Sequence, residues 1–276
     1  MKYSVSTIAF PGYEIKKLLH ISSCIGLDGV DVRVPKVEEK NGEHVPMDTS
    51  KAEREKIADY ASSLGILFSG IYGYAGRKLA DQNPKVREKE VQLIKAQVDL
   101  AVDLRASHVR IFQGNSERTE KKIQTFIQSC QEAAAYAQSR GIAIGLETHG
   151  ELAYNAKLCN RLIEGIGLDN VRIIFDPANL QNLEMDPVGE GRKMWENIAY
   201  VQFKDWRSKN QPSGEIEPVP LGEGEVNING LIDLLKQKHY NGWICLEYEK
   251  KYCPALPDPE EGLKHELEYI KHRLES

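Results

Sequence analysis

Four short apolar runs in the second half of the chain each carry a polar side chain close to their carboxyl end. The runs cover residues 142–149, 171–176, 199–205 and 243–249. The polar residues that they carry are Glu147, Asp176, Gln202 and Glu247. If the runs form neighbouring parallel strands, three carboxylates and one amide converge on one point, where a cation is needed to offset their charge. The pattern therefore indicates a divalent-metal site.

The rest of the chain alternates between strand and helix patterns, which supply a scaffold for these side chains. Apolar, β-branched segments predict four earlier strands, at residues 2–10, 29–34, 66–72 and 107–112. A helix is expected after each of the eight strands, at residues 14–25, 48–64, 84–104, 119–140, 156–165, 188–197, 227–238 and 259–274. Eight strand–helix units without a flexible linker predict a single (β/α)8 TIM-barrel domain over residues 1–276. A doubly wound sheet fits less well, because no GxGxxG motif follows the first strand.

Strand geometry predicts which way the polar side chains point. Side chains alternate across a strand, so Glu147 faces the same side as Gly145, and Gln202 faces the same side as Lys204. The residues of opposite parity are apolar and are expected to face the helices: Phe175, Val201, Phe203, Ile244 and Leu246. A single such carboxylate would equally suit a solvated edge or an ion pair. Four polar residues at the carboxyl ends of successive strands favour an active site, because barrel enzymes carry their chemistry there.

Composition and charge disfavour several classes of partner. The formal net charge of −5 comes without the clustered basic excess of a nucleic-acid-binding protein. No apolar run approaches the roughly 20 residues that cross a bilayer, and no secretory leader precedes the five scattered cysteines. We therefore expect a soluble cytoplasmic protein with reduced thiols and with neither a nucleic-acid nor a membrane partner.

Five short motifs follow one another along the second half of the chain. They are GLETH at 145–149, FDPANL at 175–180, VQFKD at 201–205, LGEGE at 221–225 and ICLE at 244–247. In this order the motifs resemble those of the xylose isomerase-like TIM-barrel superfamily, specifically its sugar phosphate isomerase/epimerase family. The resemblance implies a metal bound by Glu147, Asp176, the residue at position 202 and Glu247. It also implies that the two glutamates are the catalytic acid and base, and that Asn179 lies near the substrate.

The chain departs from the family pattern at Gln202, where the family usually has histidine. Loss of the imidazole leaves a ligand set made only of oxygen donors. Hard oxygen ligands suit Mg²⁺ or Mn²⁺ better than zinc, whose sites normally include nitrogen or sulfur. We therefore expect manganese or magnesium, with manganese preferred.

The family resemblance implies an isomerase or epimerase that acts on a small sugar, ketose or inosose through an enediolate intermediate. A metal draws charge onto the carbonyl oxygen, and carboxylates on the two faces of the intermediate remove and return a proton. Candidate substrate-binding residues, beside Asn179, are His149, Lys204, Arg207 and Arg110. Structural roles stay open for them: a core position for the histidine, and a salt bridge to Asp205 or a nearby glutamate for the cations.

Three other functions remain as alternatives. A lyase resembling 3-dehydroshikimate dehydratase would use Glu147 and His149 to remove a proton and aid the loss of water. An endonuclease for abasic DNA on the same fold is disfavoured by the acidic charge, and a non-enzymatic sugar-binding barrel would bind its ligand without isotope exchange. Residues 252–259 contain three prolines beside aromatic and apolar residues, which suits either the rim of the site or a subunit contact in a homo-oligomer.

Overall fold

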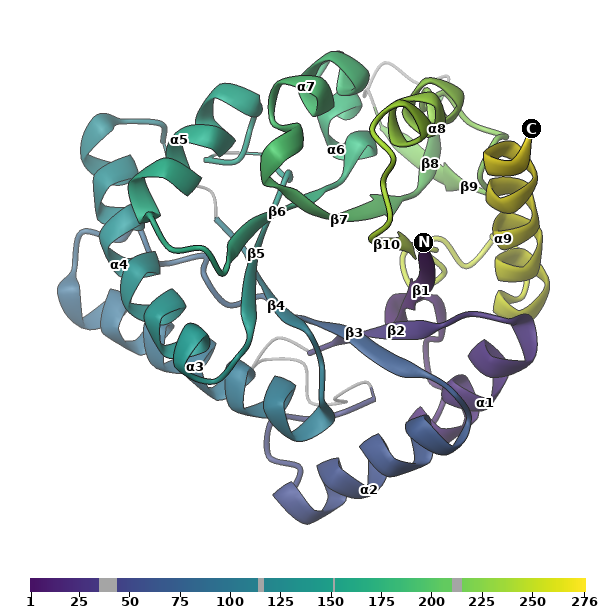
Figure 1. Ribbon diagram of the computed structural model, residues 1–276, viewed down its shortest axis with the longest axis horizontal. Coiled ribbons are helices and arrows are strands. Elements are labelled where there is room, and N and C mark those ends of the chain that lie inside the picture. Colours follow the sequence, from purple (N-terminus) through teal and green to yellow (C-terminus); the bar gives the residue numbers. More distant parts are fainter. Residues whose placement is uncertain (35–43, 114–116, 151, 210–214) are drawn as a thin grey trace.

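The computed structural model describes residues 1–34, 44–113, 117–150, 152–209 and 215–276. Within these residues, eight parallel strands close into a barrel, and helices surround it (Figure 1). Around the barrel the strands follow the order β1-β10-β7-β6-β5-β4-β3-β2. They are β1 (Lys2–Ser6), β2 (Gly29–Arg33), β3 (Leu67–Tyr72), β4 (His108–Ile111), β5 (Ala143–Glu147), β6 (Val171–Phe175), β7 (Ile198–Phe203) and β10 (Trp243–Leu246). The predicted (β/α)8 barrel is confirmed.

The helices start where the sequence offers capping side chains. Ser50 accepts a hydrogen bond from the backbone N–H of Glu53, and Asn83 accepts one from that of Lys85, so both satisfy N–H groups that a helix start leaves unpaired. The helices are α1 (Ile15–Ile25), α2 (Lys51–Ser63), α3 (Pro84–Leu104), α4 (Glu120–Ser139), α5 (Ala156–Ile166), α6 (Pro177–Asn182), α7 (Pro187–Lys193), α8 (Ile228–Gln237) and α9 (Pro259–Glu275). Among the described residues, no helix is both long and apolar enough to span a bilayer.

Three segments differ from the sequence expectation. The strand expected at residues 2–10 is the shorter β1 followed by a 3-10 turn, Thr7–Ala9. The single helix expected at residues 188–197 is α7 followed by a short 3-10 turn, and α6 precedes it. Helix α6 begins at once after the sixth strand, because Asp176 accepts the backbone N–H of Asn179 and Pro177 occupies the first helical position. The glycine- and proline-rich loop after β7 contains an antiparallel pair, β8 (Asp205–Ser208) and β9 (Ile216–Val219).

The apolar core lies between the barrel and its helices, whereas the barrel interior is polar. The five apolar side chains expected to face the helices are each at most 1 % exposed. Inside the barrel, the Tyr200 hydroxyl donates to Asp31 Oδ2 at 2.8 Å, and the His108 ring packs 4.6 Å from the Tyr200 ring. Gln202 is the next inward-facing residue of β7 after Tyr200. These buried side chains therefore form a polar floor beneath the carboxyl ends of the strands.

Candidate metal centre and active site

Three carboxylates meet at the carboxyl end of the barrel. Glu147 ends β5, Asp176 follows β6, and Glu247 follows β10. One oxygen from each lies within 4.8 Å of the other two, and the three residues are at most 4 % exposed. Thr148 holds two of these strand ends together, because its hydroxyl donates to the Asp176 carbonyl at 2.9 Å and accepts the Asp176 N–H at 2.8 Å. The structure thus brings together three of the four predicted metal ligands.

Gln202, the fourth predicted ligand, lies on β7 in register with Cys245 of β10. Its side chain is fully buried, and neither Oε1 nor Nε2 has a hydrogen-bond partner among the described residues. Leaving a buried amide without a partner is unfavourable by about 1–3 kcal/mol, so a ligand for its oxygen would remove that penalty. Three carboxylates and an amide oxygen are donors that Mg²⁺ and Mn²⁺ prefer, so the residues present fit a divalent ion.

Two buried cations neutralise part of the carboxylate charge. The Lys204 Nζ lies 3.0 Å from Asp176 Oδ2 and 2.7 Å from Glu247 Oε2. The Arg110 guanidinium forms an ion pair with Glu147 through Nη1 and Oε2. Both cations were expected near the substrate, and the structure places both against the carboxylate cluster.

These charges separate the pKa values of the buried groups. Burial raises the pKa of Glu247, but the charge of Lys204 and the hydrogen bonds from Lys204 and Tyr72 lower it to about 2. Burial also raises the pKa of Asp176, and repulsion from the two glutamates keeps it well above its ordinary value although Lys204 lowers it. Glu247 is therefore ionised at neutral pH, as a proton acceptor must be.

Tyr72 connects the two predicted catalytic glutamates, a contact that the sequence analysis did not anticipate. Its hydroxyl donates to Glu247 Oε1 at 2.6 Å and lies 3.0 Å from Glu147 Oε1. The Arg110 guanidinium carbon lies 3.3 Å from the centre of the Tyr72 ring. The signal that would have found Tyr72 is its place as the last, inward-facing residue of the third strand.

Asn179 and His149 lie at the entrance to the carboxylate cluster. The Asn179 side chain donates to Glu147 Oε1 at 3.4 Å, from the first turn of α6. The His149 ring packs 4.4 Å from the ring of Phe112. Loss of surrounding water lowers the pKa of His149, and the charges of Lys204 and Arg110 lower it further. Both side chains are therefore positioned to contact a ligand at the barrel mouth.

Arg207 lies outside this group of side chains. It belongs to β8, its side chain is 56 % exposed, and its Nε lies 3.5 Å from Glu217 Oε2 on the paired strand β9. The salt bridge considered for Lys204 and Arg207 was to Asp205 or a nearby glutamate: each pairs with a glutamate, and Asp205 forms no ion pair among the described residues. Its carboxylate accepts four backbone N–H groups, and so fastens the LGEGE segment beside the barrel: those of Trp206, Gly222, Gly224 and Val226.

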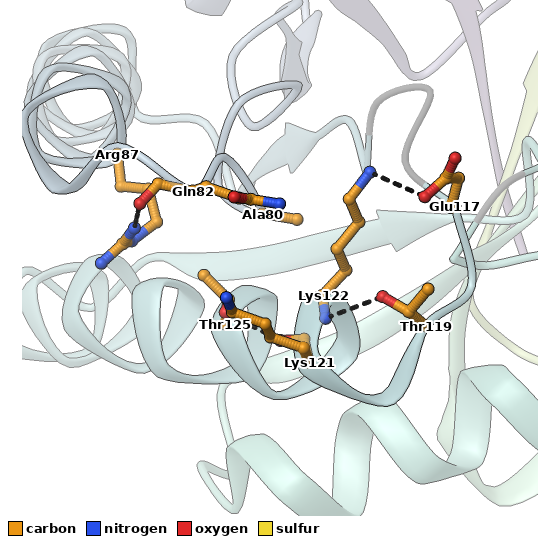
Figure 2. A pocket seen from close by; sticks show the side chains of 8 residues that line it. All are labelled: Ala80, Gln82, Arg87, Glu117, Thr119, Lys121, Lys122 and Thr125. Carbon is orange, nitrogen blue, oxygen red and sulfur yellow. Dashed lines mark hydrogen bonds and ion pairs between the residues drawn. The ribbon is translucent and has the colours of Figure 1, made fainter.

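A second depression lies between the starts of α3 and α4 (Figure 2). Two of its basic side chains contact other groups of the protein: Arg87 donates to the Asp81 carbonyl at 2.8 Å, and Lys122 lies 3.6 Å from Glu117. Its lining residues are Ala80, Gln82, Arg87, Glu117, Thr119, Lys121, Lys122 and Thr125. With one carboxylate and no buried titratable residue in that lining, this depression offers no counterpart to the carboxylate cluster.

In comparisons with known proteins, the chain is similar to an epimerase, an isomerase and a probable dehydratase. L-ribulose-5-phosphate 3-epimerase UlaE of an Escherichia coli strain is 21 % identical over 270 residues, which cover 93 % of this chain and 88 % of that protein. Hydroxypyruvate isomerase of Escherichia coli K12 is 26 % identical over 89 residues, only 32 % of this chain and 31 % of that protein. The probable 3-DHS dehydratase AsbF of Bacillus anthracis shares the fold, with a TM-score of 0.79 and 18 % identity over 98 % of this chain and 99 % of that one.

Family membership agrees with the barrel and with the motifs that carry its polar residues. The profile of one family, described as a xylose isomerase-like TIM barrel, matches residues 20–273, which include the barrel strands from β2 to β10 and all the candidate site residues. The chain therefore belongs to the xylose isomerase-like TIM-barrel family.

Proposed function

We propose that this protein is a divalent-metal-dependent isomerase or epimerase of a small sugar, ketose or inosose. The observation that carries the proposal is the buried group of three carboxylates within 4.8 Å, with the unpartnered amide of Gln202 on the adjoining strand. The similarity to an epimerase and an isomerase supports the reaction class. Four buried, unpaired cysteines support a cytoplasmic location, where thiols stay reduced.

Glu147, Asp176, Gln202 and Glu247 would hold the ion, and the all-oxygen set favours manganese or magnesium over zinc. When bound, such an ion draws electron density from the carbonyl oxygen of a ketose and makes the neighbouring C–H more acidic. Lys204, which contacts Asp176 and Glu247, lowers the pKa of Glu247 and so keeps that carboxylate ionised beside the substrate.

The two glutamates supply the proton transfer. Strands β5 and β10 are separated in the barrel by β6 and β7, so Glu147 and Glu247 approach a ligand at the mouth from different sides. One carboxylate removes the proton next to the carbonyl, and the other returns a proton to the opposite face of the planar enediolate. Tyr72 and Arg110 orient the pair, and Asn179 and His149 bind the hydroxyl groups of the substrate.

Hydrogen exchange tests this chemistry before any product is identified. The protein is incubated with a panel of ketoses and inososes in deuterated water with Mn²⁺, and the carbon-bound hydrogens are followed by NMR. We expect deuterium to enter next to the carbonyl of at least one substrate, and Mn²⁺ to be required. A protein that retains stoichiometric zinc through dialysis and gains nothing from Mn²⁺ would contradict the metal assignment.

A lyase is the second candidate, because His149 follows Glu147 by two residues at the barrel mouth and a dehydratase shares the fold over nearly the whole chain. In that reaction Glu147 or His149 removes the proton, and the imidazole then aids departure of water. Addition of dehydroshikimate separates the candidates: a lyase produces growing absorbance in the catechol band, whereas an epimerase produces isotope exchange without it.

A further inference from the structure

Aromatic side chains form one wall of the barrel mouth. The ring centres of Tyr74 and Phe112, which follow β3 and β4, lie 6.3 Å apart, and the Phe112 ring lies 4.4 Å from that of His149. At the other end of this wall, the hydroxyls of Tyr74 and Tyr252 lie 2.9 Å apart. We call these four residues the aromatic wall. It extends from the loop after β10, past β3 and β4, to the end of β5.

Arginine side chains gather on the aromatic wall. The Arg77 guanidinium carbon lies 4.3 Å from the centre of the Phe112 ring and 5.1 Å from that of Tyr74. The guanidinium carbon of Arg110 lies 5.1 Å from the same Phe112 centre, and that of Arg33 lies 5.1 Å from the Tyr74 centre. Arg77 and Arg110 therefore both lie next to the Phe112 ring, and their guanidinium carbons cannot be farther apart than the sum of their distances to its centre. Three guanidinium groups therefore lie on the aromatic wall, beside the carboxylate cluster.

Arg77 differs from Arg110 in the partners of its charge. Arg110 is buried and forms an ion pair with Glu147. Arg77 is exposed, and its interactions with the described residues are contacts with the two rings, with no carboxylate among them at ion-pair distance. A guanidinium that stacks on a ring keeps its in-plane N–H groups available and loses less freedom when it binds a ligand.

The positive charges of Arg33 and Arg110 also lower the pKa of the Tyr74 hydroxyl. Burial raises the pKa of its hydroxyl, but the hydrogen bonds from Tyr252 and Arg33 and the charges of Arg33 and Arg110 lower it below its ordinary value. An anionic group at the wall would experience the same favourable field. A neutral polyol would gain nothing from it.

We propose that Arg77 binds an oxyanion of the substrate, a carboxylate or a phosphate, and that the natural substrate is therefore an anionic polyhydroxy ketone rather than a neutral sugar. This inference rests on the proposed function, because it concerns the substrate of the same site. The planar fork of Arg77 matches either oxyanion through two parallel hydrogen bonds. The carbonyl end of the ligand then lies toward Glu147 and Glu247, and the anionic end lies on the aromatic wall.

Calorimetric binding to the Mn²⁺-loaded protein tests this inference without turnover. Two matched pairs of probes separate charge from shape: quinate against myo-inositol for a carboxylate, and ribulose 5-phosphate against ribulose for a phosphate. We expect the anionic member of one pair to bind about tenfold more tightly than its neutral partner, as a charged hydrogen-bonded contact implies. The pair that shows this difference identifies the oxyanion.

Three variants localise the effect. Arg77→Gln should reduce the difference to less than about threefold, and Arg77→Lys should retain part of it, because the charge remains without the planar fork. Arg140→Gln is the charge-matched control, since Arg140 caps the end of α4 at the opposite end of the barrel and should leave the difference unchanged.

The inference is overturned if the anionic and neutral probes of both pairs bind with equal affinity, or if neither anionic probe binds measurably. It is also overturned if the preference for the anionic probe survives in Arg77→Gln. The proposed function fails separately, if no probe or ketose undergoes hydrogen exchange. An anion preference without exchange would leave Arg77 as a binding residue of a site with another chemistry. Exchange with neutral ketoses and no anion preference would retain the function and remove the role of Arg77.

Discussion

At the scale of single residues, the site depends on Tyr72 as much as on the glutamates that it joins. One phenol contacts Glu147 and Glu247 at 3.0 and 2.6 Å, and packs under Arg110. Motifs in the second half of the chain predicted the carboxylates, because an apolar run that ends in a carboxylate is visible in a linear sequence. Tyr72 was not predicted, since its role depends on which residues lie across the barrel from β3.

Replacing Glu147 by Gln tests the acid–base assignment. The amide keeps the shape and a possible metal ligand but cannot accept a proton, so turnover and hydrogen exchange should fall by at least about 10²-fold. Metal content is measured together with activity. The same measurements on Glu247→Gln test the other glutamate of the acid–base pair, and the same loss of activity is expected. Substantial activity in Glu147→Gln with the metal still bound would show that another group removes the proton.

Tyr72→Phe tests the hydroxyl that joins the glutamates. The ring and its contact with Arg110 remain, while Glu247 loses a hydrogen-bond donor and Glu147 loses its contact with the hydroxyl, so we expect kcat to fall about tenfold or more with a smaller change in KM. Ser63→Ala, at the end of α2, is a control that also deletes one hydroxyl. Unchanged kcat in Tyr72→Phe would restrict Tyr72 to packing.

At the scale of elements, the strand–helix alternation was predictable, and the short insertions were not. Asp205 holds the LGEGE segment through the backbone N–H groups of Gly222 and Gly224. The strands β8 and β9 pair beside it, although the local sequence is typical of a loop. Gly224 allows this close approach, because a Cβ there would lie 2.1 Å from Asp205 Oδ1. Such contacts depend on chain segments that meet only in the folded barrel.

Helix α9 carries a buried carboxyl whose titration predicts a pH dependence of stability. Glu266 is 2 % exposed, and it accepts the Leu221 N–H at 3.2 Å. Burial raises its pKa to about 8 from an ordinary value of 4.5. Between these two values the folded protein holds one proton more than the unfolded chain, so stability falls as the pH rises.

Glu266→Gln removes this titration. The free energy of unfolding in urea, measured at pH 5 and pH 8, should fall with pH more in the wild type than in the variant, by about 1 kcal/mol or more. Subtracting the two proteins cancels the other titrating groups. A difference that is the same at both pH values would mean that Glu266 is ionised in the fold throughout.

At the scale of the whole molecule, closure of the barrel brings together residues that are far apart in the sequence, such as Tyr72 and Glu247, which are 175 positions apart. The sequence predicted this closure from eight strand–helix units, and parity predicted which residues face the interior. Arg110 was predicted near the substrate, but Arg33 and Arg77 were not, because their meeting on the aromatic wall needs the order of the strands and the positions of the loops. The reaction subtype likewise depends on the shape of the mouth.

Metal binding should couple to global stability, because the ion binds the folded protein and neutralises buried carboxylates. A concentration of Mn²⁺ about a hundredfold above its Kd should stabilise the fold by about 2.7 kcal/mol and raise Tm by roughly 5 °C or more. Gln202→Leu gives a distinct signature. The metal-free variant should be at least as stable as the wild type, since a buried amide without a partner is removed, and its response to Mn²⁺ should be much smaller. An equal response in both proteins would exclude Gln202 as a ligand.

Anomalous X-ray diffraction from crystals of the Mn²⁺-loaded protein tests the central assignment most directly. A single strong peak should lie within coordination distance, roughly 2.0–2.6 Å, of oxygens from Glu147, Asp176, Gln202 and Glu247. Absence of a peak among these four side chains at saturating Mn²⁺, or a peak bound by other residues, would contradict the account.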